Sequence, residues 1–273
     1  MPEYARLISC DEAGFTGPEL LNEEQPFFVY AAIDLTPSEA QTIIDRTRVT
    51  HRVQAPELKS KVLRKRPKWP QIAGDVARTS EGRAIVISFD KRLNLAGKAF
   101  KYLIEPVLED NNTLFYRHNL HRFVMSALHR VMLGSGKGVD QLAVELQEFM
   151  RSFDPATAPT IFEQRDRRDE ASVVLDCLLR FVRGYASRVE ARTAHLRAGE
   201  SDVGKWALDL TSAAAFSLVM RGWGHRYRTI DLLCDESKAT SGNRWILQQL
   251  RWTNRRDRDI RRAPQHPDQG KSS

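Results

Sequence analysis

The sequence has few cysteines and no long apolar run. Its three cysteines, Cys10, Cys177 and Cys234, are scattered along 273 residues, and no Cys-x-x-Cys pair occurs. This pattern excludes a zinc ribbon and a disulfide framework, so we expect three reduced thiols in the core. No segment approaches the ~20 apolar residues of a membrane span, and the N-terminus lacks the apolar stretch of a signal peptide. We therefore expect a cytoplasmic protein with no membrane partner.

Acidic residues are outnumbered by basic ones. The chain has 42 Lys and Arg against 35 Asp and Glu, a net charge of +7, and a pI of about 9.4. Its 41% of apolar and 28% of charged residues are typical of a globular protein, which at this length has one large domain or two small ones. The excess of base favours a polyanionic partner. We expect nucleic acid, either DNA or RNA.

The first apolar segment runs directly into two acidic residues and a turn. Residues 5–10 predict a short buried strand, Asp11 and Glu12 follow it, and Gly14 and Gly17 allow the backbone to turn sharply. Such a strand would hold the Asp11 carboxylate at the mouth of a sheet, where it is useful for chemistry. The alternative is an ordinary turn, in which the acidic side chains bond local backbone amides.

Further strands and helices follow from the apolar pattern. Residues 27–33 are almost continuously apolar and predict a central strand buried on both faces, joined to the first by a long hairpin connection. A Thr-Pro-Ser-Glu capping box at Thr36 predicts a helix to about Val53. The remaining apolar segments predict strands over 84–89 and 229–235 and helices over 69–80 and 241–252.

Residues 97–221 have helical periodicity throughout. We expect helices over about 120–132, 139–150, 169–197 and 202–221. The sequence therefore predicts an α/β protein with a mixed sheet of the ribonuclease H type. The predicted units are a core of residues 1–96 and 226–252, a helical insertion module at 97–225, and a flexible basic tail at 253–273.

Three predicted strands run into an aspartate, namely Asp11, Asp90 and Asp235. If these strands are neighbours, their carboxylates converge and repel one another unless a cation lies between them. Mg²⁺ and Mn²⁺ prefer such oxygen ligands and can activate water for phosphodiester hydrolysis. This pattern points to a metal-dependent nuclease. Asp90 is either a further metal ligand or an ion-pair partner of Lys91 or Arg92.

The sequence also resembles a known family. The segment from Asp11 to Gly17 is similar to the Asp-Glu-Ser-Gly motif that opens the domain-of-unknown-function 3800 family, with Ala13 in place of Ser. Glu57-Leu58-Lys59 resembles its Glu-apolar-Lys motif, and residues 230–237 resemble its later strand that ends in an acid. The resemblance implies a ribonuclease H-like fold. It also implies that Asp11, Glu57 and Asp235 bind metal and that Lys59 is a phosphate or acid partner.

These patterns together predict a Mg²⁺- or Mn²⁺-dependent hydrolase of nucleic-acid phosphodiesters. The basic stretch over 57–68 supplies the predicted nucleic-acid ligands, although a solvated helix face explains it as well. Those ligands are Lys59, Lys61, Arg64, Lys65 and Arg66. Two other functions stay open. One is a catalytically impaired nucleic-acid-binding protein with the same fold, and the other is a module that recruits a protein partner through its helices.

One family feature is not matched. The family closes with a Ser-rich stretch and a helix bearing a last acid, whereas this sequence stops at Ser273, about where that stretch would begin. The tail acids Asp257, Asp259 and Asp268 have no apolar stripe to position them. The resemblance therefore predicts weak metal binding and low or absent cleavage by this chain, with nucleic-acid affinity largely retained.

Other eye-catching motifs have simple structural explanations. The stretch from Gly134 to Gly138 mimics part of a phosphate loop but joins two predicted helices, so we expect a linker. His118, His121 and His129 lack acids at ligand spacing, and we expect packing or surface roles. Trp245 and Trp252 lie among arginines; base stacking is an alternative, but their seven-residue spacing favours a core stripe.

Overall fold

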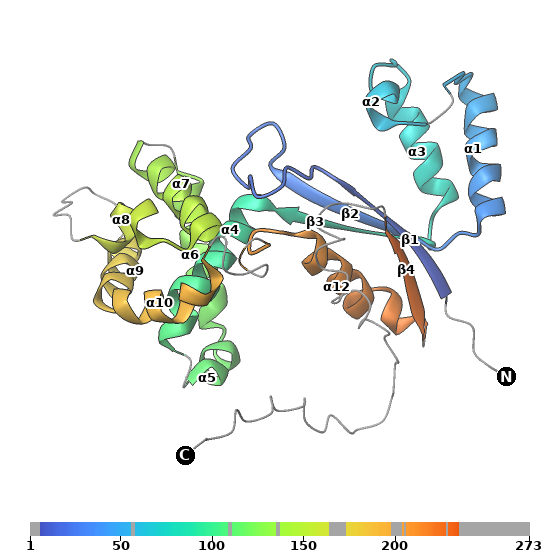
Figure 1. The fold of residues 1–273 in the computed structure, drawn as a ribbon. Coiled ribbons are helices and arrows are strands. Elements are labelled where there is room, and N and C mark those ends of the chain that lie inside the picture. Colours follow the sequence, from blue (N-terminus) through green and yellow to red (C-terminus); the bar gives the residue numbers. More distant parts are fainter. Residues whose placement is uncertain are drawn as a thin grey trace.

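The computed structural model describes residues 6–55, 58–108, 111–134, 137–163, 173–197, 204, 206–227 and 229–234. They contain a four-stranded mixed sheet with helices around it (Figure 1). The strands are β1 (Arg6–Ala13), β2 (Phe27–Ile33), β3 (Ala84–Asp90) and β4 (Ile230–Cys234), arranged in the order β3-β2-β1-β4. β2 is antiparallel to both β1 and β3, whereas β4 is parallel to β1. The predicted α/β architecture is confirmed, including the return of the last strand to the side of the first.

One face of the sheet packs on helices. Side chains alternate along each strand, so Ile8 and Cys10 of β1 share a buried face with Phe28 and Tyr30 of β2. Helix α12 (Thr211–Arg221) packs against β2 and β3. The same hydrophobic core continues into the helical half of the chain. The predicted module at 97–225 therefore shares its core with the sheet. Helix α12, although it lies within that range, packs against the sheet.

The opposite face of the sheet is open as far as the described residues go. Large apolar side chains on it stay half exposed, at 49% for Leu7, 52% for Phe27, 61% for Val86 and 56% for Leu233. The prediction that residues 27–33 are buried on both faces is therefore wrong for this part of the chain. The strand is apolar on both sides, but neighbouring elements cover only the side of Phe28 and Tyr30. Asp11 lies on the open face.

The first helices form a small unit of their own. They are α1 (Pro37–His51), α2 (Ser60–Leu63) and α3 (Trp69–Thr79), and in Figure 1 they stand apart from the sheet. The capping box at Thr36 is present, and Arg52 ends α1 in the left-handed conformation. A separate cluster of Val53, Leu63 and Ile72 holds the unit together.

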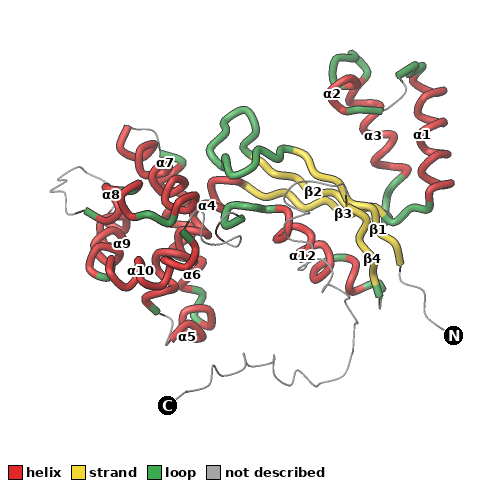
Figure 2. The backbone as a smooth tube through the Cα atoms, in the orientation of Figure 1, coloured by secondary structure: helices red, strands yellow, loops and turns green. Residues whose placement is uncertain are grey.

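A larger block of helices lies at the other end of the sheet in Figure 2, drawn in red. Its α-helices are α4 (Lys91–Ala99), α5 (Asn112–Arg117), α6 (Leu120–Met132), α7 (Lys137–Ser152), α8 (Pro159–Phe162), α9 (Val173–Gly184) and α10 (Ala186–Thr193). The block begins at Lys91, six residues earlier than the predicted start at residue 97. The helix predicted over 169–197 is divided at Tyr185 into α9 and α10. In the part of the chain that the structure describes, no helix is both long and apolar enough to span a membrane.

Candidate functional site

Asp11 lies inside β1 and not after its end. Strand β1 continues to Ala13 because β2 supplies pairing partners this far, with Asp11 opposite Ala31 and Ala13 opposite Val29. The expectation of a strand that ends at residue 10 is corrected by these three extra residues. The Asp11 side chain is exposed, and its Oδ1 accepts a hydrogen bond from the backbone N–H of Glu12 at 2.8 Å. This local bond orients the carboxylate on the open face while leaving it accessible.

The two adjacent acids point to opposite sides of the sheet. Strand alternation puts Glu12 in register with Tyr30, on the face that the helices cover. Gly14 follows with a φ of +79°, and a Cβ atom at this position would lie 2.2 Å from the carbonyl oxygen of Phe27. Only glycine fits such a close approach with positive φ. The turn after Asp11 is therefore fixed by β2 itself.

Helices of the block hold the loop that follows Asp11. Lys91, at the start of α4, is 1% exposed, and its ammonium group donates a hydrogen bond to Thr16 Oγ1 at 2.7 Å. Helix α7 contributes Gln147, whose Oε1 accepts from the N–H of Leu20 at 2.7 Å, and Arg151, which pairs with Glu19 at 2.9 Å. Desolvation of the buried ammonium lowers the pKa of Lys91. Helices α4 and α7 thus hold the loop from Thr16 to Leu20 in place after Asp11.

The other predicted metal ligands, Glu57 and Asp235, lie outside the described residues. The neighbour of Asp235 is described, since Cys234 is paired with Cys10 in the parallel ladder between β4 and β1. Asp11 and Asp235 are therefore the residues that directly follow the paired Cys10 and Cys234 in the sequence. Within the described residues, no group of three His, Cys, Asp or Glu side chains could hold a metal ion.

Asp90 is not close to Asp11. Asp11 is level with Ala31 and Val86, whereas Asp90 lies four residues further along β3. The separation is roughly 13 Å along the strand and about 10 Å across two strand spacings, too far for a shared ion. Asp90 caps α4 by accepting from the N–H of Leu93 at 2.9 Å, and its Oδ2 lies 3.4 Å from Nε2 of His129. The partner of this carboxylate is thus a helix end and a histidine, and neither Lys91 nor Arg92 pairs with it.

The predicted nucleic-acid ligands divide into two groups. Lys61, Arg64 and Lys65 are exposed around α2. Lys59, at the N-cap of α2, is exposed as well, whereas Arg66 is half-buried and donates to the backbone carbonyls of His51 and Arg52. Arg66 therefore closes the C-terminal end of α1. Its role as a phosphate ligand stays a prediction.

Sequence reasoning missed a group of polar side chains on the covered face of the sheet. Cys10 is buried and Cys234 half-buried, but Cys177 is exposed, so the expectation of three core cysteines fails for Cys177. The neighbouring thiol of Cys10 and the hydroxyl of Tyr30 lower the pKa of Cys234 to about 7, while the nearness of Cys234 and burial raise the pKa of Cys10. The strand register could have signalled this pair, because residues 10 and 234 are each one position before a predicted ligand.

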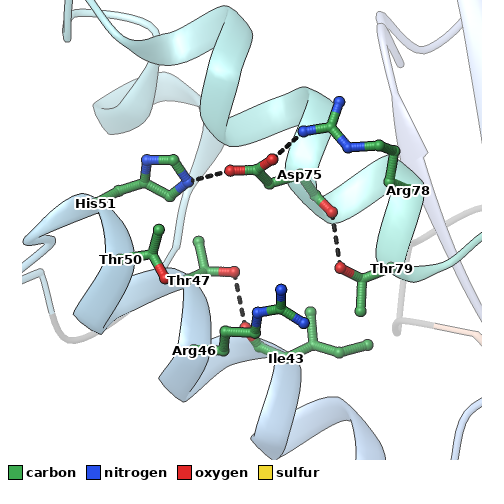
Figure 3. A pocket seen from close by; sticks show the side chains of 8 residues that line it. All are labelled: Ile43, Arg46, Thr47, Thr50, His51, Asp75, Arg78 and Thr79. Atoms are coloured by element: carbon green, nitrogen blue, oxygen red, sulfur yellow. Dashed lines mark hydrogen bonds and ion pairs between the residues drawn. The ribbon is translucent and has the colours of Figure 1, made fainter.

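A pocket between α1 and α3 was also missed (Figure 3). Its cavity of about 330 Å³ is lined by polar residues, among them Arg46, His51, Asp75 and Arg78. The signal was present in the spacing of Ile43, Thr47, Thr50 and His51, which puts polar groups at positions where a helix usually turns apolar residues inward.

The remaining motifs behave as structural elements. Helix α6 ends at Met132 and α7 begins at Lys137, so Lys137 and Gly138 of the predicted linker belong to α7, and residues 135–136 lie outside the described residues. His121 packs against the rings of Tyr116 and Phe100. The predicted helix at 241–252, with Trp245 and Trp252, and the tail at 253–273 lie outside the described residues.

The chain matches no protein-family model, no curated protein and no solved structure. The resemblance to the domain-of-unknown-function 3800 family therefore rests on the short motifs alone and stays a prediction.

Proposed function

We propose that the protein is a Mg²⁺- or Mn²⁺-dependent hydrolase of nucleic-acid phosphodiesters, built on a ribonuclease H-like sheet. The observation that carries the proposal is the pairing of Cys10 with Cys234 across parallel strands. Parallel neighbours in register send their chains in the same direction, so Asp11 and Asp235 each come one residue later. In this proposal the two carboxylates share a metal site, which Glu57 completes.

The Asp11 side chain fits a hard cation. A carboxylate supplies the oxygen ligands that Mg²⁺ and Mn²⁺ prefer, and the bond from the Glu12 N–H restricts its orientation. A bound ion would activate water and offset the charge that develops on the phosphate. The protein would contribute an open face for the strand, and Lys59 would act as a phosphate or acid partner.

A second function is favoured by the distribution of charge. Residues 37–79 contain ten Lys and Arg against four Asp and Glu, which accounts for +6 of the net charge of +7. This concentration on the α1–α3 unit supports binding of a phosphate backbone whether or not the chain cleaves it. A nucleic-acid-binding protein without cleavage activity is therefore the alternative.

Cleavage assays separate the two functions. Labelled DNA and RNA are incubated with the wild type, Asp11→Asn and the control Asp231→Asn in Mg²⁺, Mn²⁺ or chelator. Asp231 is an exposed aspartate on the same sheet face, paired with Leu7. The proposal predicts metal-dependent product from the wild type and from Asp231→Asn, and a loss of at least about 100-fold in Asp11→Asn. Equal cleavage by Asp11→Asn and the wild type would eliminate the hydrolase at this site.

A further inference from the structure

The pocket between α1 and α3 has one wall from each helix, and among the described lining residues only the α3 wall contributes an acid. Helix α1 contributes Arg46, Thr50 and His51, and helix α3 contributes Asp75, Arg78 and Thr79. A volume of about 330 Å³ falls at the small end of the range for sites that hold small molecules, about 300–1,000 Å³. The pocket is therefore large enough for a compact polar group.

The acid in this pocket, Asp75, already has partners for its negative charge. One oxygen of Asp75 lies 2.7 Å from Nε2 of His51, and the other accepts a hydrogen bond from Arg78. These contacts, the one with His51 foremost, lower the pKa of Asp75, so the carboxylate is ionised and paired at neutral pH. Asp75 thus offsets the charge of Arg78 and leaves none for a second arginine.

Arg46 is that second arginine. Figure 3 shows its guanidinium group lying between the two helices, below the pair of His51 and Asp75. Among the described residues Arg46 has no hydrogen-bond or ion-pair partner. The adjacent carboxylate, Asp45, instead contacts Arg48 and accepts a hydrogen bond from Gln41. The pocket therefore has an uncompensated positive charge.

The hydroxyl groups add one free donor. Thr47 and Thr79 donate to the carbonyl oxygens of Ile43 and Asp75 in their own helices, at 2.7 and 2.8 Å. Thr50 has no such bond to a described residue, and Figure 3 places its side chain on the wall beside Thr47. A guanidinium group with a nearby hydroxyl donor is a suitable pair for a tetrahedral oxyanion.

We propose that this pocket binds a phosphate group, with Arg46 as the charged ligand and Thr50 as a hydroxyl donor. The assignment of that phosphate to nucleic acid rests on the proposed function, because the pocket belongs to the basic α1–α3 unit. Two sources share this chemistry, the terminal phosphate of a strand and an internal phosphodiester. The affinity of the pocket for phosphate itself does not depend on any cleavage at Asp11.

Two measurements test the proposal on the full chain. The first is thermal unfolding with added inorganic phosphate at constant ionic strength. The second is binding of one oligonucleotide sequence with either a 5′-phosphate or a 5′-hydroxyl end. Both use the wild type, Arg46→Gln and the matched control Arg122→Gln, which removes the same charge from an exposed position on α6, outside the pocket.

We expect phosphate to raise the Tm of the wild type and of Arg122→Gln but not of Arg46→Gln. A preference of about tenfold for the 5′-phosphate, lost only in Arg46→Gln, would identify a strand end. Equal binding of both ends, with Arg46→Gln weakened about tenfold more than Arg122→Gln, would identify an internal phosphodiester. The proposal is overturned if phosphate shifts the Tm of all three proteins equally or not at all. Cleavage is not part of either readout, so failure of the hydrolase proposal would leave this result unchanged.

Discussion

Cys10 and Cys234 are direct partners across the parallel strands β1 and β4, with both side chains on the covered face of the sheet. The neighbouring side chains of Cys10 and, second, of Tyr30 favour the thiolate of Cys234 and outweigh its desolvation, which lowers the pKa of Cys234 to about 7. Asp11 follows Cys10 directly in β1, and its side chain points to the opposite, open face of the sheet.

The first prediction concerns the reactivity of this thiol. In a Cys177→Ser background, alkylation of Cys234 by iodoacetamide should reach half its maximal rate near pH 7, because the thiolate is the reactive form. Cys10→Ala should move the midpoint upward more than Tyr30→Phe does, since the contact with Cys10 is the larger cause. A midpoint that is the same in all three proteins would show that neither partner controls the thiol.

The second prediction concerns the turn after Asp11. Gly14→Ala puts a methyl group against the carbonyl oxygen of Phe27 at positive φ, and we expect a loss of about 3 kcal/mol in the free energy of unfolding. Gly17 also has positive φ, but a Cβ atom there meets nothing within 4 Å. Gly17→Ala should therefore cost about 1 kcal/mol. Urea unfolding compares the two, and equal losses would contradict the close approach.

The third prediction is a pH dependence of stability. Hydrogen bonds from Arg83 and from Thr36 lower the pKa of Glu39 from its ordinary value of 4.5 to about 2. A depressed carboxyl pKa stabilises the fold fully above pH 4.5, and this contribution is lost as the pH falls toward 2. Glu39→Gln should therefore lower the Tm at pH 7 and approach the wild type at pH 3.

The control for this effect is Glu81→Gln. Glu81 is exposed and forms no ion pair with a described residue, so its replacement should leave the Tm unchanged at both pH values. A Tm difference for Glu39→Gln that does not change between pH 7 and pH 3 would contradict the assigned hydrogen bonds.

The fourth prediction places the phosphate backbone on α2. Replacing Lys61, Arg64 and Lys65 by Gln should reduce the slope of log K against log salt by about 0.7–0.9 for each lost phosphate contact. The matched control replaces Arg117, Arg122 and Arg130, three exposed arginines of α5 and α6, by Gln. Equal slopes for the two triple variants would show that total charge, and not the α1–α3 unit, determines binding.

The sequence predicted the four strands and the helices α1, α6 and α7, because each carries a clear local signal. The helix predicted over 202–221 is shorter, since α12 begins at Thr211. Phe27–Ile33 is an uninterrupted apolar run, and the capping box at Thr36 begins α1 as expected. The extra length of β1 was not predictable in this way, since pairing with β2 extends the strand through the polar residues Asp11 and Glu12. Exposure of one sheet face was equally invisible, because apolar residues alternate on both sides of β2.

The candidate site was predicted less completely. Asp11 lies accessible on the open face of the sheet, inside β1 and not beyond its end, and Asp90 is removed from it by the strand register and serves as a helix cap. Arg66 looked like a free cation in a basic run, yet the fold brings it to the end of α1. Roles of this kind depend on which distant residues meet, and no local pattern contains that information.

Calorimetric titration with Mn²⁺ tests the central claim most directly. The wild type and Asp231→Asn should bind Mn²⁺ with the same affinity, whereas Asp11→Asn should bind at least about tenfold more weakly, because it lacks a charged oxygen ligand. Indistinguishable titrations of the wild type and Asp11→Asn would contradict a metal site at Asp11.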